Sequence, residues 1–175
     1  GPVAIGEGSL VKAGATVYGG TSIGPTCKIG GEIEASVIQS FSNKQHGGFL
    51  GHSYVASWVN LGAATDNSDL KNNYGNVRVE MDGEVVDTGA RSVGAVIGDH
   101  SKTAIGTKLN TGAVVGIFCN VVSRGLAPKS IPDFAWGTGD GFVRYDLGKA
   151  LETASTVMGR RGRSLTPALR RRIEA

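Results

Sequence analysis

An aliphatic residue recurs at every sixth position near the start of the chain, and this period restricts the possible folds more than any other feature. The first series comprises Ile5, Val11, Val17, Ile23 and Ile29. Small residues follow most of these positions four residues later, and the period resumes from Phe49 and from Ile97. A hexapeptide period is typical of a parallel β-helix, in which three strand-and-corner units close one triangular coil. The aliphatic side chains then point into the prism.

The period predicts an all-β fold, a left-handed parallel β-helix of hexapeptide repeats with about four coils. The composition agrees, because 28 glycines and only 6% aromatic residues suit tight corners and a core of small side chains. We expect the β-helix over residues 1–122, with inserted loops at 39–48 and 66–92. In the second loop the Asp82-Gly83 pair separates two alternating segments, which predicts a β-hairpin.

The repeat stops after residue 122. Residues 123–175 are expected to form an irregular crossing and then C-terminal helices, because apolar residues recur on one helical face between Leu147 and Met158. Such a helix would form a cap for the unpaired strand edges at the end of the coil. The first coil is already in register at Ile5, so further coils or another domain are expected upstream of it.

The charge is concentrated at one end of the chain. Residues 160–175 contain six arginines and one acidic residue, which leaves 12 basic and 14 acidic residues elsewhere. A nearly neutral body does not favour nucleic-acid binding. No apolar run is long enough to span a bilayer, so we expect a cytoplasmic protein without a membrane partner. Cys27 and Cys119 show neither metal-ligand spacing nor a disulfide framework, and no metal is expected.

Three short elements carry a resemblance to a known family: "SNKQHGGFLGHSY", "NLGAAT" and "LKNNY", in this order. They resemble the C-terminal half of bifunctional glucosamine-1-phosphate acetyltransferase/N-acetylglucosamine-1-phosphate uridyltransferase and of related bacterial sugar-phosphate nucleotidyltransferases. The resemblance covers most of residues 23–160. It implies an N-acetyltransferase that uses acetyl-CoA, acts on an amino-sugar phosphate or nucleotide sugar, and works as a homotrimer. The nucleotidyltransferase domain of these proteins is expected upstream, outside this sequence.

The resemblance also implies an active site within residues 40–75. The catalytic histidine of the family precedes a Thr/Ser-Tyr pair, and His52 precedes Ser53-Tyr54. An imidazole suits a general base for the sugar amino group because its pKa lies close to working pH. A second catalytic residue is implied at Asn73. Substrate contacts are implied for Lys44, Tyr54 and Asn60. Contacts with CoA are implied for Ala63, Tyr74 and Ile105.

Two alternatives remain open. The spacing from His52 to Tyr54 is one residue shorter than in the family, and Ile105 stands where the family usually has Ser, which favours a non-catalytic trimerisation or regulatory domain of a sugar-1-phosphate nucleotidyltransferase. The second alternative is a γ-class carbonic anhydrase, a β-helix trimer that holds zinc with three histidines. The separations of His46, His52 and His100 do not resemble that enzyme. His100 is expected to point outward, into solvent or a trimer contact, and the roles of His46 and of the Arg-rich C-terminus stay undefined.

Overall fold

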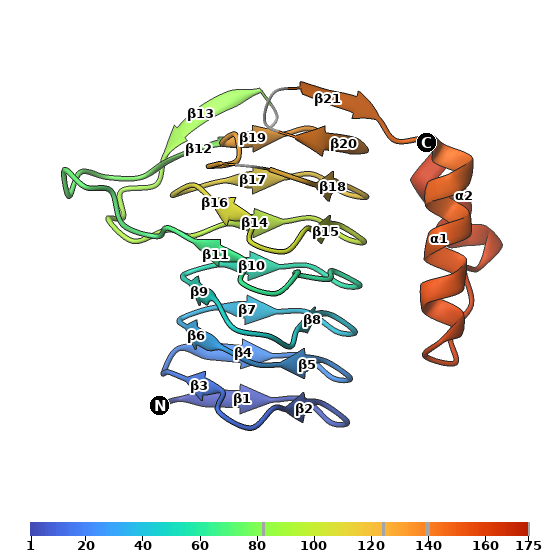
Figure 1. Cartoon of the computed structure of the whole chain (residues 1–175), viewed down its shortest axis with the longest axis horizontal. Helices are drawn as coiled ribbons and strands as arrows, with labels where there is room; N and C mark the ends of the chain where they lie inside the picture. The colour runs from blue at the N-terminus through green and yellow to red at the C-terminus, as the bar shows by residue number, and fades with distance from the viewer. Residues whose placement is uncertain (82, 124, 139–140, 175) are drawn as a thin grey trace.

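The computed structural model describes residues 1–81, 83–123, 125–138 and 141–174, and its strands stack into a tall column of turns (Figure 1). The first face of the column is a seven-stranded parallel sheet with one strand from each successive turn. In order, its strands are β1 (Val3–Ile5), β4 (Thr21–Ile23), β7 (Val37–Ile38), β10 (Tyr54–Val55), β14 (Val96–Ile97), β17 (Val114–Val115) and β19 (Ser130–Ile131).

The other two faces are shorter parallel sheets. The second face contains β2 (Leu10–Val11), β5 (Lys28–Ile29) and β8 (Asn43–Lys44), then a bridge at Asn60, then β15 (Lys102–Thr103), β18 (Asn120–Val121) and β20 (Ala135–Thr138). The third face contains β3 (Thr16–Val17), β6 (Glu32–Glu34), β9 (Phe49–Gly51), β11 (Asp66–Asn67) and β16 (Lys108–Leu109). The predicted parallel β-helix is therefore confirmed.

The core lies along the axis of the column. In each two-residue strand one side chain points in and the other points out, so that Ile29 and Ile97 are fully buried while Lys28 and Val96 face outward. The aliphatic residues of the hexapeptide series fill this axis from Ile23 onward. Those of the first turn, such as Ile5, are about half exposed because no turn covers them from below.

Three features of the predicted coil were wrong. The column has about eight turns instead of four. Residues 39–48 do not leave it as a loop, since β8 pairs in parallel with β5. The coil also continues beyond residue 122, because β19 pairs with β17 and β20 with β18. The pattern hid these turns because their inward positions are not all aliphatic: Lys44 occupies the place of Ile29 one turn further along.

The second predicted insertion leaves the coil after β11 and returns before β14. It contains the expected hairpin, formed by β12 (Arg78–Met81) and β13 (Glu84–Asp87) in antiparallel register. Gly83 has a φ of 80° in the turn, while Asp82 lies outside the described residues. Val77 and Val79 are buried and fasten the base of the hairpin to the coil. A second antiparallel strand, β21 (Gly141–Arg144), pairs with β20.

The C-terminal helices are α1 (Leu147–Gly159) and α2 (Pro167–Glu174), and they lie along the side of the column (Figure 1). The Asp146 carboxylate accepts a hydrogen bond from the Lys149 amide and caps α1. The helices cover a corner at which five rings from successive turns stack with centroids 4.2–5.9 Å apart, an arrangement we call the aromatic ladder: Phe41, Trp58, His100, Phe118 and Phe134. Among the described residues, neither helix is long and apolar enough to cross a bilayer.

The prediction that His100 points into solvent was wrong. Its side chain is buried between Trp58 and Phe118 in the aromatic ladder, with ring centroids 5.9 and 4.7 Å away. Each ladder residue has a φ between 55° and 65°, a left-handed conformation that turns the side chain sideways at the corner. Burial, and to a lesser extent the charge of Lys102, lowers the pKa of His100 to about 4.

Candidate functional site

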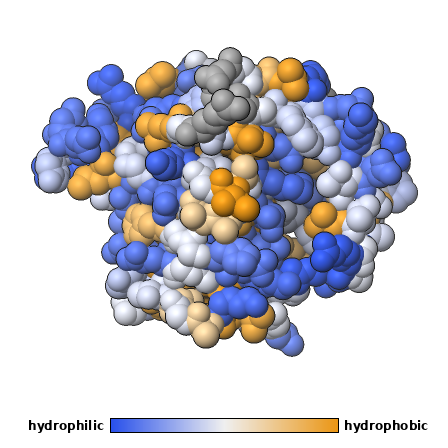
Figure 2. All heavy atoms as spheres, in the orientation of Figure 1, coloured by the Kyte–Doolittle hydropathy of each residue, from blue (hydrophilic) through white to orange (hydrophobic). Residues whose placement is uncertain are grey.

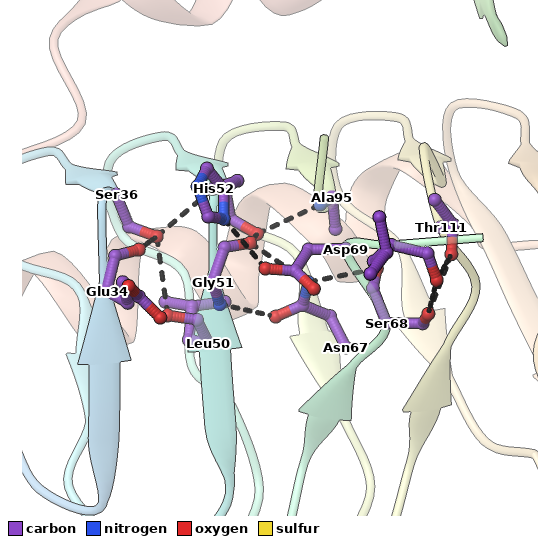
Figure 3. Close-up of polar contacts among 12 residues, drawn as sticks. Glu34, Ser36, Leu50, Gly51, His52, Asn67, Ser68, Asp69, Ala95 and Thr111 are labelled. Atoms are coloured by element: carbon purple, nitrogen blue, oxygen red, sulfur yellow. Dashed lines mark hydrogen bonds and ion pairs between the residues drawn. The ribbon is translucent and has the colours of Figure 1, made fainter. Parts of the chain in front are cut away.

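His52 lies at the corner where the third face passes into the first, and its imidazole pairs with the carboxylate of Asp69 (Figure 3). The distance from Nδ1 to Asp69 Oδ2 is 2.7 Å. The His52 side chain remains 34% exposed and that of Asp69 20% exposed, so the pair is accessible from solvent. A φ of 47° at His52 directs the ring away from the corner toward the next turn. The pair therefore sits on the rim of the coil.

Buried polar groups hold both partners in place (Figure 3). The Asn67 side chain accepts a hydrogen bond from the Gly51 amide and donates one to the Gly51 carbonyl, at 2.8 and 3.0 Å. The amide of Val93 donates to the Asp69 carbonyl at 2.8 Å and joins the two ends of the insertion, which we call its neck. A side chain at Gly94 would collide with the Gly51 carbonyl, so the chain can return here only as glycine. Rigid support of this kind suits a catalytic group.

The pairing defines what the imidazole can do. A neutral His52 donates its Nδ1 proton to the Asp69 carboxylate, which leaves Nε2 as a proton acceptor. When Nε2 takes up a proton, the adjacent carboxylate stabilises the resulting positive charge. The arrangement is that of an oriented general base.

Lys44 does not occupy the position expected of a phosphate ligand. Its side chain points into the coil and only 2% of the residue is exposed. The ammonium donates hydrogen bonds to the carbonyl groups of Gly30, His46 and Gly48, at 3.4, 3.2 and 2.5 Å. Burial lowers its pKa. The three carbonyl contacts use the three donors of the ammonium, so Lys44 serves the fold of this corner.

Tyr54 and Asn60 lie on different faces of the column. Tyr54, two residues after His52, begins β10, points outward and is 43% exposed. Asn60 lies on the second face, where its Oδ1 accepts a hydrogen bond from Asn43 Nδ2 at 3.3 Å. Arg161, which follows α1, donates to Asn43 Oδ1 at 3.2 Å. The structure thus places Tyr54 near His52 in the chain, and Asn60 beside Asn43, which Arg161 contacts.

The remaining predicted residues form two groups. Ala63 and Ile105 occupy equivalent positions on successive turns at the corner between the second and third faces, where the Gly106 amide donates to the Ala63 carbonyl at 2.8 Å. Ile105 is 80% exposed. Asn73 and Tyr74 belong to the insertion, where Asn73 Oδ1 accepts a hydrogen bond from the Gly75 amide and Tyr74 is 66% exposed.

Asp69 was not predicted, although the sequence holds a signal for it. It follows His52 by 17 residues, close to the 18 residues of one triangular coil, so it stacks one turn above the histidine. The three histidines, in contrast, occupy three different corners: His46 follows β8, His52 follows β9, and His100 stands in the aromatic ladder. The fold of one chain does not gather them into a single site.

Comparisons with known proteins place this geometry in context. No family model matches the chain. A curated relative from Sulfurisphaera tokodaii, described as a bifunctional sugar-1-phosphate nucleotidylyltransferase/acetyltransferase, is 32% identical over 106 residues. That match spans 59% of this chain and 26% of the relative. The predicted resemblance is confirmed. The chain corresponds to about a quarter of the length of this relative, so it is similar to one part of a larger protein.

Solved structures share the fold at low sequence identity. The acetyltransferase domain of PglB from Neisseria gonorrhoeae, solved in complex with acetyl coenzyme A, is 17% identical with a TM-score of 0.57, over 78% of this chain and 57% of that one. AntD, an N-acyltransferase from Bacillus cereus solved with dTDP and 3-hydroxybutyryl-CoA, is 14% identical with a TM-score of 0.60, over 91% of both chains. These likenesses establish the β-helix architecture.

Proposed function

We propose that the chain is an acyltransferase domain that transfers an acetyl group from acetyl-CoA to the amino group of an amino-sugar phosphate or nucleotide sugar. The observation that carries the proposal is the accessible His52–Asp69 pair, in which Nδ1 lies 2.7 Å from Oδ2. Support comes from the relative whose description includes acetyltransferase activity and from the acyltransferases that share the fold. The same relative supports a place for the chain within a sugar-1-phosphate nucleotidyltransferase.

The pair supplies the proton transfers of the reaction. The amine nitrogen of the sugar attacks the thioester carbonyl while His52 Nε2 accepts a proton from that amine. The Asp69 carboxylate stabilises the imidazolium that forms. The C–N bond forms and the C–S bond then breaks. The proton returns to the departing thiolate, which gives the N-acetylated sugar and free CoA. Tyr54, exposed on the strand that follows His52, is proposed as a sugar contact.

The corner of Ala63 and Ile105 is proposed as the CoA contact. It exposes backbone and apolar surface at equivalent positions on successive turns, which suits an elongated thiol arm lying along the column. PglB and AntD were solved with acyl-CoA or acetyl-CoA bound to the same architecture. We propose acetyl-CoA as the donor for this chain on that support.

We further propose that three copies assemble side by side with parallel axes. Val37, Tyr54 and Val96 form a row on the first face, in register on successive turns, and the first two are 38% and 43% exposed. On the face that Figure 2 shows, apolar residues are interspersed with hydrophilic ones. An apolar row beside the His52 corner fits a subunit contact that completes the site.

The function is tested by thioester cleavage with acetyl-CoA and a panel of amino-sugar phosphates and amino nucleotide sugars. His52→Ala is expected to lower turnover by roughly a hundred- to ten-thousandfold, the usual contribution of a general base. His46→Ala, which removes an exposed histidine at another corner, is the matched control and should retain turnover. Near-normal turnover of His52→Ala would contradict the proposal and favour the non-catalytic assembly domain. Melting curves of all three proteins should coincide.

A further inference from the structure

The insertion forms a hollow against the coil, directly above the His52–Asp69 pair, that none of the proposed roles uses. We call it the loop pocket. It has a volume of about 450 Å³ and lies between Ser68 and residues 70–73 on one side and the corners of the next two turns on the other. The polar side chains that matter for its chemistry are those of Ser68, Lys71, Asn73, Asn110, Thr111 and Lys129.

The charge of the loop pocket is positive. Lys71 and Lys129 both line it, one from the insertion and one from the coil. Each ammonium is held by one backbone carbonyl: Lys71 Nζ donates to Asn76 at 3.0 Å, and Lys129 Nζ donates to Arg78 at 2.6 Å. An ammonium has three donors, so each lysine is positioned by one contact and retains donors for a ligand. Among the described residues, the lining includes no carboxylate.

The neutral lining also offers hydrogen bonds to an anion. Ser68 Oγ and Thr111 Oγ1 lie 2.7 Å apart, and the Leu70 carbonyl accepts from the hydroxyl that does not donate within this pair, so the two hydroxyls fasten the insertion to the next turn. Asn73 and Asn110 also line the pocket, and because their Oδ1 atoms accept from the backbone amides of Gly75 and Thr111, their Nδ2 groups are left as donors. Two cations with side-chain amide donors are groups that recognise phosphate oxygens in proteins.

The pocket also has a defined position relative to the proposed chemistry. Ser68 lines the pocket and is followed by Asp69, whose carboxylate contacts His52. Thr111 lies one turn above Ser68, and successive turns are about 4.8 Å apart. The His52–Asp69 pair and the positive pocket are therefore neighbours, because Ser68 of the pocket and Asp69 of the pair are consecutive residues.

From this arrangement we propose that the loop pocket binds a phosphate group of a substrate of the acyl transfer, an inference that rests on the proposed function. The acceptor is the better source of that phosphate. An amino-sugar phosphate or amino nucleotide sugar carries a basic nitrogen at one end and phosphate at the other, which matches the acidic pair and the basic pocket. Lys71 and Lys129 then take the role in phosphate binding that the sequence had suggested for Lys44, whose donors are used inside the coil.

The test replaces each lysine by glutamine, which removes the charge but keeps a donor for the backbone carbonyl. For Lys71→Gln and Lys129→Gln we expect KM for the phosphorylated acceptor to rise roughly tenfold with kcat unchanged, because a ground-state contact is lost. Lys12→Gln, an exposed lysine at the far end of the column, is the matched control and should leave KM unchanged. Calorimetric titration with inorganic pyrophosphate reports the pocket independently of turnover and should weaken in the two pocket variants alone.

The possible results distinguish a failure of the phosphate-pocket proposal from a failure of the acyl-transfer proposal. A rise in KM for acetyl-CoA alone would also support a phosphate site but would assign it to the donor. Unchanged KM for both substrates, or an equal change in Lys12→Gln, would overturn the proposal while leaving acyl transfer intact. Pyrophosphate binding that the pocket variants lose, in a protein without acyl transfer to any acceptor, would support the pocket and count against the proposed function.

Discussion

Asp69 shows how a single residue acquires a role from its place in the stack. It is exposed to solvent on one side, close to His52 on the other, and its backbone carbonyl accepts the Val93 amide that closes the insertion. The carboxylate fixes which imidazole nitrogen carries the proton. Its contribution to the reaction is therefore indirect, as that of a positioning residue acting through His52.

The Asp69→Asn substitution tests this role. The amide keeps the size of the carboxylate but cannot compensate the imidazolium, so kcat should fall roughly ten- to a hundredfold, less than for His52→Ala. KM for both substrates and the melting temperature should change little, because the residue does not contact substrate in this proposal. A merely structural role would instead lower the melting temperature and leave kcat of the folded protein unaffected. Steady-state kinetics with thermal unfolding distinguish the two.

The sequence indicated the site only in part. His52 could be singled out because a histidine beside Tyr54 in a glycine-rich segment fits a known pattern. The inward direction of Lys44 could not be foreseen, because a buried lysine leaves no mark in a hydrophobic periodicity. Likewise, the pairing of residues 17 apart becomes visible only when the length of each turn is known. In residues 39–68 the sequence therefore did not show which side chains point inward or which residues stack on successive turns.

At the scale of elements, the aromatic ladder explains where the C-terminal helices dock. Phe118 and Phe134 pack with Ala150 and Ala154 of α1, and the Arg163 guanidinium lies 5.6 Å from the Phe41 ring centroid. Small residues on the helix allow its backbone to approach the flat stack of rings. The helices therefore run along the column and bury its most aromatic corner.

Burial of His100 within the ladder makes stability depend on pH. The pKa of His100 is about 4 in the folded protein and 6.5 in the unfolded chain. Between these pH values the unfolded chain binds a proton at His100 and the folded protein does not. The free energy of unfolding is therefore unaffected by His100 well above pH 6.5, and it falls as the pH drops from 6.5 toward 4. Between pH 7 and pH 5 the loss amounts to about 2 kcal/mol.

His100→Phe should remove this dependence, because a phenyl ring can stack between Trp58 and Phe118 without titrating. Urea unfolding at pH 7 and pH 5 measures the effect. The free energy of unfolding of wild type should fall between these pH values by about 2 kcal/mol more than that of the variant. Carboxylates titrate in both proteins, and subtraction cancels them. Equal losses in the two proteins would show that His100 is exposed or already charged when folded.

At the scale of the whole molecule, the hexapeptide period was sufficient to predict a parallel β-helix, since a residue in phase with Ile23 must point inward on every turn. It underestimated the number of turns because Lys44 breaks the aliphatic series without leaving the coil and because the coil continues past residue 122. The path of the C-terminal helices along the column depends on contacts between residues about a hundred positions apart, such as Asn43 and Arg161. Local patterns carry no signal for such contacts.

The proposed trimer gives a prediction at the same scale. Light scattering at micromolar concentration should give a mass three times the 18.0 kDa of one chain. Glutamate at Val37 and Tyr54 together should shift the mass toward the monomer, because charged groups would be buried in the contact. Val143→Glu, at a 68% exposed position on β21, is the control. A monomeric wild-type protein would contradict the proposal.

The two ends of the insertion are joined where it leaves the coil, so the insertion can change in sequence separately from the His52–Asp69 pair. The chain leaves the coil after Ser68 and returns at Val93, and the bridge between Leu70 and Ser92 joins the two ends. Asp69 belongs to the neck, whereas Lys71 and the hairpin lie beyond it. The exposed tip of the hairpin, beyond the buried Val77 and Val79, can lengthen, shorten or be exchanged while the turns above and below keep their register. Selection can thus alter the insertion, and with it the proposed phosphate pocket, without disturbing the histidine and its carboxylate, and a designer can graft a foreign segment at the hairpin turn.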